Sequence, residues 1–166
     1  MSTPTSILMV CMGNICRSPM AQAVAQSQAL ALGLTDVKVD SAGTHGHTHA
    51  GEPPDPRARA VLQRREYPLP RHRARRITAG DFERHDLIVA MDRYNLGALR
   101  EVCPAGVGHK MVLLLDFAPG LQGQDVPDPY YGDATGFERV LDLCESGVRG
   151  LLDALRGGQL PFRASA

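Results

Sequence analysis

Residues 7–18 read ILMVCMGNICRS, and this stretch decides the fold. Its first four residues are all apolar, which is typical of a strand that is buried on both faces. A loop with one glycine follows and leads into a helical pattern from about residue 18 to residue 32. Ser18 is the expected N-cap, Pro19 the first helical residue and Gly33 the residue just past the end. The stretch therefore predicts a buried strand, a loop and a helix in succession.

Three further stretches predict the other strands of a sheet, and the last two of them are apolar at every position. They lie at residues 37–39, 87–91 and 111–115. Apolar residues recur every three or four positions between residues 137 and 155, which predicts a long last helix, with Thr135 and Glu138 as its capping box. Strands that alternate with helices predict an α/β fold. We expect a single open parallel sheet of about four strands, with helices on both faces and the loop of residues 11–18 between the first strand and the first helix.

Length, charge and cysteine content narrow the class of protein. The 166 residues, 43% of them apolar, predict a single domain over residues 1–166, with a frayed tail after about residue 157. Eighteen basic and eighteen acidic side chains cancel, so neither nucleic acid nor a membrane is expected as a partner. The chain begins without a basic segment followed by a long apolar run, and its four cysteines include no CxxC pair. Both features predict a soluble cytoplasmic protein whose cysteines are reactive or buried rather than disulfide-bonded.

The loop after the first strand has the features of an anion-binding site. Backbone N–H groups at a helix N-terminus lack partners within the helix, and the helix dipole favours negative charge there. Gly13 permits backbone conformations that other residues resist. The same surroundings, with an arginine nearby, favour the thiolate form of Cys11. Arg17 carries a planar fork of donors that suits two phosphoryl oxygens. The loop therefore predicts a phosphate site with a nucleophilic cysteine.

Four motifs along the chain point to one family. The loop contains Cys-x5-Arg-Ser, with Gly and Asn inside it and Pro after it. The other three motifs are Ser41-Ala42-Gly43-Thr44, Pro54-Asp55-Pro56-Arg57-Ala58 and Asp128-Pro129-Tyr130-Tyr131. This combination resembles the low-molecular-weight protein tyrosine phosphatases, and the resemblance extends from about residue 7 to residue 156. It implies hydrolysis of phosphotyrosine on protein substrates, with inorganic phosphate as product and with no metal or organic cofactor.

The resemblance also implies a role for each matching residue. Cys11 would attack phosphorus and form a phosphocysteine, Arg17 would hold the phosphate, and Asp128 would act as general acid and base. The nearby Asp125 lacks the following Pro-Tyr-Tyr and is expected to be a solvated loop charge. The rest of the phosphate-binding loop comprises Met12, Gly13, Asn14, Ile15, Cys16 and Ser18. A supporting network would consist of Asn14, Ser18, Ser41 and His72, and Tyr130 and Tyr131 would line the substrate mouth.

Two features of the predicted site have more than one interpretation. Cys16 either packs in the core or captures an oxidised Cys11 as a reversible disulfide. Relatives usually have an aromatic residue between Thr44 and Gly51 as one wall of the pocket, whereas this chain has histidines, so we assign His47 and His49 to the mouth. Because an unperturbed imidazole titrates near pH 6.5, substrate binding is expected to depend on pH. Without acidic or cysteine ligands nearby, these histidines do not predict a metal site.

Three alternative functions share the expected fold or its phosphate loop. A thiol-dependent arsenate reductase would need further cysteines close together, and only Cys103 and Cys144 are available, far apart in sequence. A protein arginine phosphatase would be expected to carry a small Thr where this chain has Ile15. A catalytically silent phosphate-binding module would be expected to lack the nucleophile or the acid, and both are present. Phosphotyrosine hydrolysis is therefore the leading hypothesis.

Overall fold

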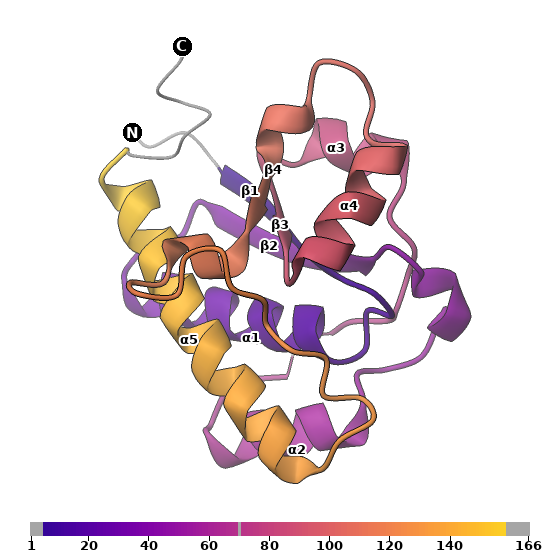
Figure 1. Cartoon of the computed structure of the whole chain (residues 1–166). Helices are drawn as coiled ribbons and strands as arrows, with labels where there is room; N and C mark the ends of the chain where they lie inside the picture. Colours follow the sequence, from indigo (N-terminus) through magenta and orange to yellow (C-terminus); the bar gives the residue numbers. More distant parts are fainter. Residues whose placement is uncertain (1–4, 70, 159–166) are drawn as a thin grey trace.

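The computed structural model describes residues 5–69 and 71–158 (Figure 1). Most of the tail that was expected to fray, residues 159–166, lies outside this range. The strands are β1 (Thr5–Cys11), β2 (Val37–Gly43), β3 (Leu87–Ala90) and β4 (Met111–Leu113). The α-helices are α1 (Arg17–Ala31), α2 (Pro56–Arg64), α3 (Ala79–Arg84), α4 (Arg93–Val102) and α5 (Ala134–Arg156). Short 3-10 helices are η1 (Gly46–His49), η2 (Gly108–Lys110) and η3 (Leu114–Phe117).

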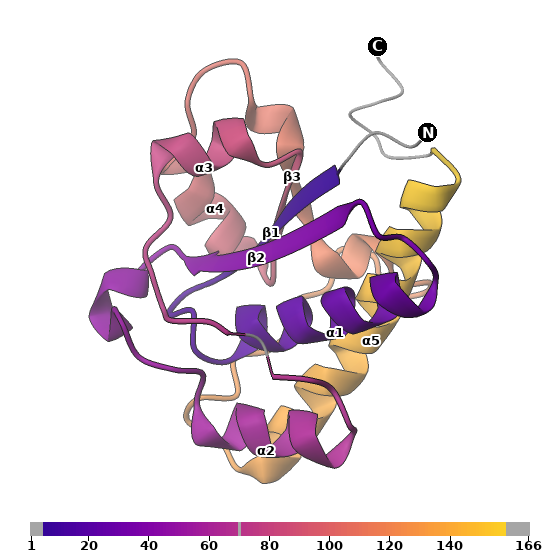
Figure 2. The ribbon, with the colours of Figure 1, turned by 180° about the vertical axis from the view of Figure 1, so that it is seen from behind.

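The four strands form one parallel sheet in the order β2-β1-β3-β4. Ile7 of β1 pairs with Val39 on one side and with Leu87 on the other. Because side chains alternate along a strand, Ile7 and Met9 enter the core that includes α1 and α5, whereas Leu8 and Val10 enter the core that includes α3 and α4. Figures 1 and 2 show the two layers of helices on opposite faces of the sheet. The predicted α/β fold is confirmed.

The carboxyl ends of the strands and the phosphate loop meet at one edge of the sheet. Thr44 and His45 donate backbone hydrogen bonds to the carbonyl oxygens of Cys11 and Met12, at 2.9 and 2.8 Å. A Cβ at Gly43 would lie 2.5 Å from the Met12 carbonyl oxygen, so only glycine allows the two segments to approach this closely. The end of β2 therefore braces the start of the loop.

Two predicted helix starts were wrong. Helix α1 begins at Arg17, with Cys16 in the N-cap position, because the Ser18 hydroxyl is engaged inside the loop instead. Helix α5 is capped by Asp133, whose carboxylate accepts hydrogen bonds from the backbone of residues 135 and 136. The carboxylate of Glu138, the predicted partner in the capping box, is paired instead with Arg64 and Arg65 near the end of α2.

No helix in residues 5–69 and 71–158 combines the length and the apolar character needed to cross a lipid bilayer.

Candidate active site

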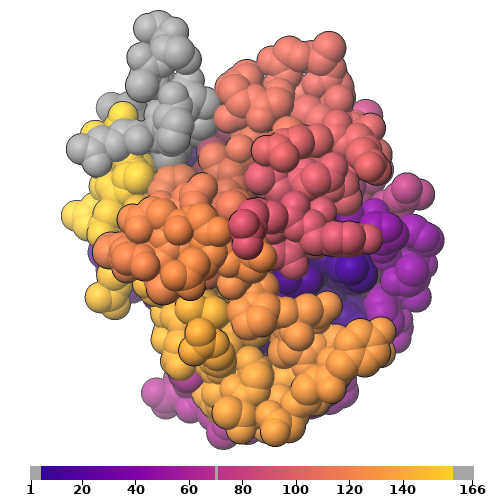
Figure 3. Space-filling view, viewed as in Figure 1, coloured from indigo at the N-terminus to yellow at the C-terminus, as the bar shows by residue number. Residues whose placement is uncertain are grey.

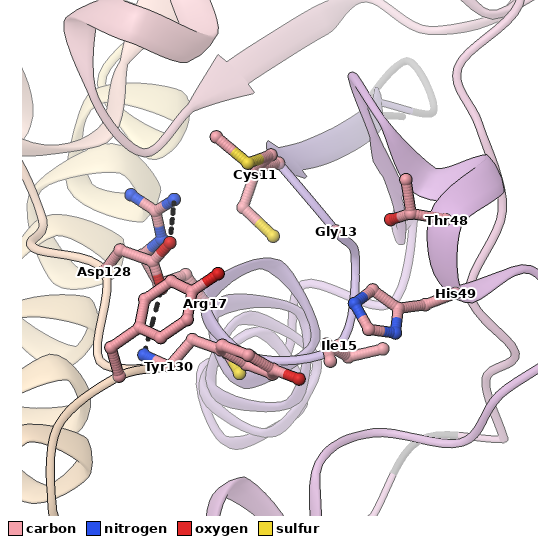
Figure 4. Close-up of a pocket in the computed structure, with 11 residues that line it drawn as sticks. Cys11, Gly13, Ile15, Arg17, Thr48, His49, Asp128 and Tyr130 are labelled. Carbon is pink, nitrogen blue, oxygen red and sulfur yellow. Dashed lines mark hydrogen bonds and ion pairs between the residues drawn. The ribbon is translucent and has the colours of Figure 1, made fainter.

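A pocket of about 310 Å³ opens above the phosphate loop. Figure 3 shows the hollow, with indigo residues from near the N-terminus at its floor, and Figure 4 shows its lining. The lining residues come from the loop, from the η1 turn and from the segment before α5. They are Cys11, Met12, Gly13, Ile15, Cys16, Arg17, Thr48, His49, Asp128, Tyr130 and Tyr131. Segments that are distant in sequence thus converge on the end of β1.

Cys11 is the last residue of β1, and its thiol faces the loop. Its Sγ atom lies 3.0 Å from the Oγ atom of Ser18, the second residue of α1. Both residues are buried. The serine hydroxyl is therefore placed to stabilise negative charge on the sulfur.

Asn14 holds the loop in an unusual backbone conformation. Its φ angle is +61°, in the left-handed region that non-glycine residues rarely occupy. Its amide nitrogen donates to the hydroxyl oxygens of Ser18 and Ser41, at 2.9 and 3.0 Å. Its amide oxygen accepts from His72 Nε2 at 2.8 Å and from the backbone N–H of Arg75 at 3.0 Å. Four contacts thus compensate for the strained backbone.

His72 lies beside Asn14 and also reaches the Ser41 hydroxyl, at 3.3 Å. Burial lowers the pKa of His72; Asp40 opposes the effect and Arg75 adds to it. The neutral imidazole is therefore favoured, and it donates its Nε2 proton to Asn14. The structure brings together all the residues of the predicted supporting network.

Arg17 is buried, with 2% of its side chain exposed. Its Nη1 atom donates to Oδ2 of Asp92 at 2.6 Å and to the carbonyl oxygen of Val126 at 3.0 Å. Its Nη2 atom lies 3.7 Å from Oδ2 of Asp128. Burial opposes the charge, but Cys11, Asp92 and Asp128 together outweigh it and raise the pKa of Arg17. The guanidinium is thus a fixed cation at the pocket wall.

The two aspartates of the 125–128 segment have different surroundings. Asp128 lines the pocket, is 39% exposed, and accepts a hydrogen bond from the backbone of Tyr130 at 3.1 Å. Asp125 does not line the pocket. It is not merely a solvated charge as expected, because it accepts a hydrogen bond from the Arg93 backbone at 3.0 Å and pairs with the Arg93 side chain.

Tyr130, Tyr131 and His49 are the aromatic side chains in the lining of the pocket. Tyr130 and Tyr131 contact each other edge to face at 5.0 Å between ring centroids, and Arg57 lies over the Tyr130 ring at 5.6 Å. The assignment of His47 to the mouth was wrong: its side chain is exposed and lies against His45. Because the segment forms a 3-10 turn rather than an extended chain, positions 47 and 49 point in different directions. Thr48 takes the place beside His49 in the lining.

Cys16 is buried within the loop and borders the pocket. Burial raises the pKa of its thiol, and the nearby Asp55 and Cys11 raise it further. All four cysteines are free thiols in this structure. Cys144 is fully buried in α5, where burial raises its pKa to about 12, and Cys103 donates to the carbonyl of Pro104.

Sequence reasoning missed the importance of Asp92 for this site. Asp92 caps α4, because one of its carboxylate oxygens accepts a hydrogen bond from the Asn95 backbone at 2.7 Å. Its other carboxylate oxygen holds Arg17. The signal was available, because Asp92 follows β3 and adjacent parallel strands end at the same edge of a sheet. Within the described part of the chain, no group of three or more His, Cys, Asp or Glu side chains is arranged to hold a metal ion.

Comparison with known proteins places this geometry in a family. Residues 6–159 match the family described as low molecular weight phosphotyrosine protein phosphatase. The chain belongs to this family. A low molecular weight protein-tyrosine-phosphatase from Streptomyces coelicolor is 46% identical over 154 residues, which cover 90% of this chain and 93% of the relative.

Solved structures of family members superpose closely on this one. The crystal structure of a protein tyrosine phosphatase from Entamoeba histolytica has a TM-score of 0.89 and 38% identity, covering 94% of this chain and 99% of that one. The YwlE arginine phosphatase, solved as a mutant with a phosphorylated active-site serine, has a TM-score of 0.82 and 29% identity, covering 92% and 96%. Proteins with this fold are therefore named for the dephosphorylation of two different residues, tyrosine and arginine.

Proposed function

We propose that the protein hydrolyses phosphotyrosine monoesters on proteins through a phosphocysteine intermediate. The observation that carries the proposal is the thiol of Cys11, 3.0 Å from the Ser18 hydroxyl at the floor of a pocket that Arg17 and Asp128 also line. The proposal treats residues 1–166 as one catalytic domain. It includes a cytoplasmic location, which four cysteines without a disulfide favour, because the cytoplasm keeps thiols reduced.

In the first step, the Cys11 thiolate attacks phosphorus and the bond to the tyrosyl oxygen breaks. The loop N–H groups and the Arg17 fork hold the phosphoryl oxygens, so charge is stabilised where it develops. Asp128, exposed at the pocket edge, donates its proton to the leaving phenolate.

In the second step, water attacks the phosphocysteine and the sulfur leaves. Asp128, now a carboxylate, removes a proton from that water, which follows from reversing its first role. The Ser18 hydroxyl donates to the departing thiolate, and Asn14 holds that hydroxyl in place. The products are tyrosine and inorganic phosphate.

Arginine phosphatase activity is the second candidate, because YwlE has the same fold. Ile15 favours the aryl substrate: it is 8% exposed and its side chain lines the pocket, so it adds apolar surface where a phenyl ring would pass. An arsenate reductase that relays electrons through further thiols is not favoured, because Cys144 is buried with a raised pKa and Cys103 lies at the end of α4.

The test is phosphate release from a phosphotyrosine peptide and from a phosphoarginine peptide, with reductant and without metal. We expect the wild type to turn over phosphotyrosine and Cys11→Ser to be inactive, while Cys103→Ser serves as the matched control that retains activity. Turnover of phosphoarginine alone would transfer the assignment to the second candidate. Inactivity on both substrates would refute the proposal.

The protective disulfide between Cys11 and Cys16 remains a prediction. It requires the Cys16 thiol, whose pKa is raised by burial, to attack an oxidised Cys11. Mass mapping after mild peroxide treatment tests it. A trapped sulfenic acid on Cys11 without a link to Cys16 would show that Cys16 only packs.

A further inference from the structure

His49 and Glu52 form a hydrogen-bonded pair at the rim of the pocket. Nδ1 of His49 lies 2.6 Å from Oε2 of Glu52. The histidine side chain is 27% exposed and the glutamate 56%, so the carboxylate faces solvent while the imidazole is largely covered. The pair therefore joins the pocket wall to the outer surface.

The backbone fixes Glu52 in this position. Its N–H donates to the carbonyl oxygen of His49 at 2.9 Å, and its own carbonyl oxygen accepts from Ala74 at 2.8 Å. The neighbouring Gly51 donates back to the Ala74 carbonyl at 2.9 Å. Since both sides of Glu52 are anchored, its side chain has a short and defined reach to the imidazole.

The imidazole rests on the phosphate loop. A Cβ added to Gly13 would lie 3.1 Å from Cδ2 and 3.7 Å from Nε2 of His49, so this edge of the ring faces the loop. Figure 4 shows His49 on the side of the pocket opposite Arg17 and Asp128, with one ring nitrogen turned inward. The centroid of the Tyr130 ring lies 6.0 Å from the centroid of the His49 ring.

This arrangement gives the two ring nitrogens separate tasks. Nδ1 donates to the Glu52 carboxylate, so in the neutral imidazole Nε2 carries a lone pair, and in the imidazolium it carries a proton. Within residues 5–69 and 71–158, Nε2 has no hydrogen-bond partner. The inward nitrogen is thus available to a ligand, and its character changes with protonation.

We propose that Glu52 positions His49 as a proton-dependent wall of the catalytic pocket, which binds aryl phosphates more tightly when the imidazole is protonated. The inference rests on the proposed function, because it assumes an aryl phosphate seated on the phosphate loop. The imidazolium adds positive charge beside the phosphate and attracts the face of the substrate ring. Glu52 stabilises that charge through a charge-assisted hydrogen bond.

Binding also requires a change at the mouth. Neighbouring stacked or tilted rings have centroids about 4.5–7 Å apart, so a third ring does not fit between His49 and Tyr130 at their present 6.0 Å. His49 is tied to Glu52 and supported by Gly13, whereas Tyr130 is 36% exposed, so we infer that Tyr130 is the side chain that shifts to admit the substrate ring. Besides Glu52, the titratable or charged groups that line the pocket with His49 are Cys11, Cys16, Arg17, Asp128, Tyr130 and Tyr131.

The test measures kcat and KM from about pH 5.5 to pH 8, with a phosphotyrosine peptide whose flanking residues are uncharged. The proteins compared are the wild type, His49→Phe, Glu52→Gln and Glu52→Ala. The ratio of the variant KM to the wild-type KM at each pH cancels the titration of the substrate phosphate and of the other pocket groups. For His49→Phe we expect this ratio to be about twofold to fivefold larger at the acid end than at the alkaline end, with the effect mainly on KM rather than kcat.

The two Glu52 variants distinguish the effect of the position of the His49 ring from the effect of the negative charge on Glu52. Glu52→Gln keeps an acceptor for Nδ1, so we expect the KM at high pH to stay near wild type while the gain in affinity at low pH shrinks. Glu52→Ala releases the ring and is expected to raise KM at every pH. Glu101→Gln, an exposed acid at the far end of α4, is the matched control and should behave as wild type.

Parallel pH profiles of KM in the wild type and His49→Phe would overturn the inference, even if both enzymes are fully active. A wild type that does not hydrolyse phosphotyrosine at any pH would instead overturn the proposed function and this inference with it. The two failures are therefore distinguishable.

Discussion

Nη1 of Arg17 lies 2.6 Å from Oδ2 of Asp92, although 75 positions separate the two residues in the chain. The contact orients a buried guanidinium before any substrate is present. Since Asp92 also caps α4, the same residue joins the catalytic loop to the helix that follows β3. A phosphate clamp that is preorganised in this way does not have to be assembled when the substrate binds.

Replacing Asp92 with Asn tests this preorganisation. Asparagine caps a helix about as well as aspartate, so α4 should remain, but the charge opposite Arg17 is lost. We expect kcat/KM for phosphotyrosine to fall roughly tenfold or more, the value of a hydrogen bond to a charged group. Asp133→Asn changes the cap of α5 in the same way and should leave kcat/KM near wild type. Equal effects of the two variants would contradict a role for Asp92 at the site.

Asp128→Asn should separate the acid role from binding. A general acid matters most when the leaving phenolate is a strong base, so we expect kcat/KM to fall by about 10²–10⁴-fold with phosphotyrosine. With aryl phosphates of increasingly acidic phenols the loss in kcat/KM should become smaller. The measurement is kcat/KM for such a series, because this ratio covers the step in which the phenol leaves and not the later hydrolysis of the phosphocysteine; Asp125→Asn is the control because Asp125 pairs with Arg93 outside the pocket. A loss of the same size across the series would argue against proton donation.

His72 should make stability fall in mild acid. Burial lowers its pKa in the folded state below the ordinary value of 6.5. Between those two pKa values the unfolded chain binds more protons, so the free energy of unfolding decreases as the pH falls through this window. His85, whose pKa burial also lowers, acts in the same direction.

Denaturant unfolding of the wild type and His72→Gln, measured on both sides of pH 6.5, checks this expectation. Glutamine carries an N–H donor but does not titrate, so the variant should lose less stability on acidification than the wild type. Identical slopes of stability against pH would mean that His72 makes no contribution.

Two glycines in helices should respond to alanine in opposite ways. A Cβ at Gly150 in α5 would lie 1.7 Å from the Phe117 carbonyl oxygen, whereas a Cβ at Gly97 in α4 would have no atom within 4 Å. Gly150→Ala is expected to lower the free energy of unfolding by about 3 kcal/mol through steric overlap. Gly97→Ala should raise it by up to about 1 kcal/mol through helix propensity. Thermal and denaturant unfolding decide; a harmless Gly150→Ala would show that α5 packs less closely on η3.

Local patterns predicted the elements better than their ends. The apolar run before Cys11 identified β1, because a strand buried on both faces needs apolar residues at every position. The helix start at Ser18 and the Thr135–Glu138 capping box were wrong for one reason. Ser18 and Glu138 are both taken by tertiary partners, the Cys11 thiol and the arginines near the end of α2. A capping pattern states what a side chain can bind, and other contacts decide what it does bind.

By itself the sequence determined which chemical groups the site contains and their order along the chain. These groups are a thiol at the end of a buried strand, a loop of backbone amides, an arginine and a later Asp-Pro-Tyr-Tyr motif. Each of them is recognisable from residues that are neighbours in the sequence. Only the tertiary structure decided that Asp92 holds Arg17 and that His49 rather than His47 faces the pocket. The first outcome depends on how segments pack at the edge of the sheet. The second depends on the 3-10 geometry of η1, which turns positions 47 and 49 in different directions. The position of Asp92 after β3 indicates the sheet edge at which it lies. Which side chain it binds there depends on packing between distant segments, and such packing leaves no periodic pattern in the chain.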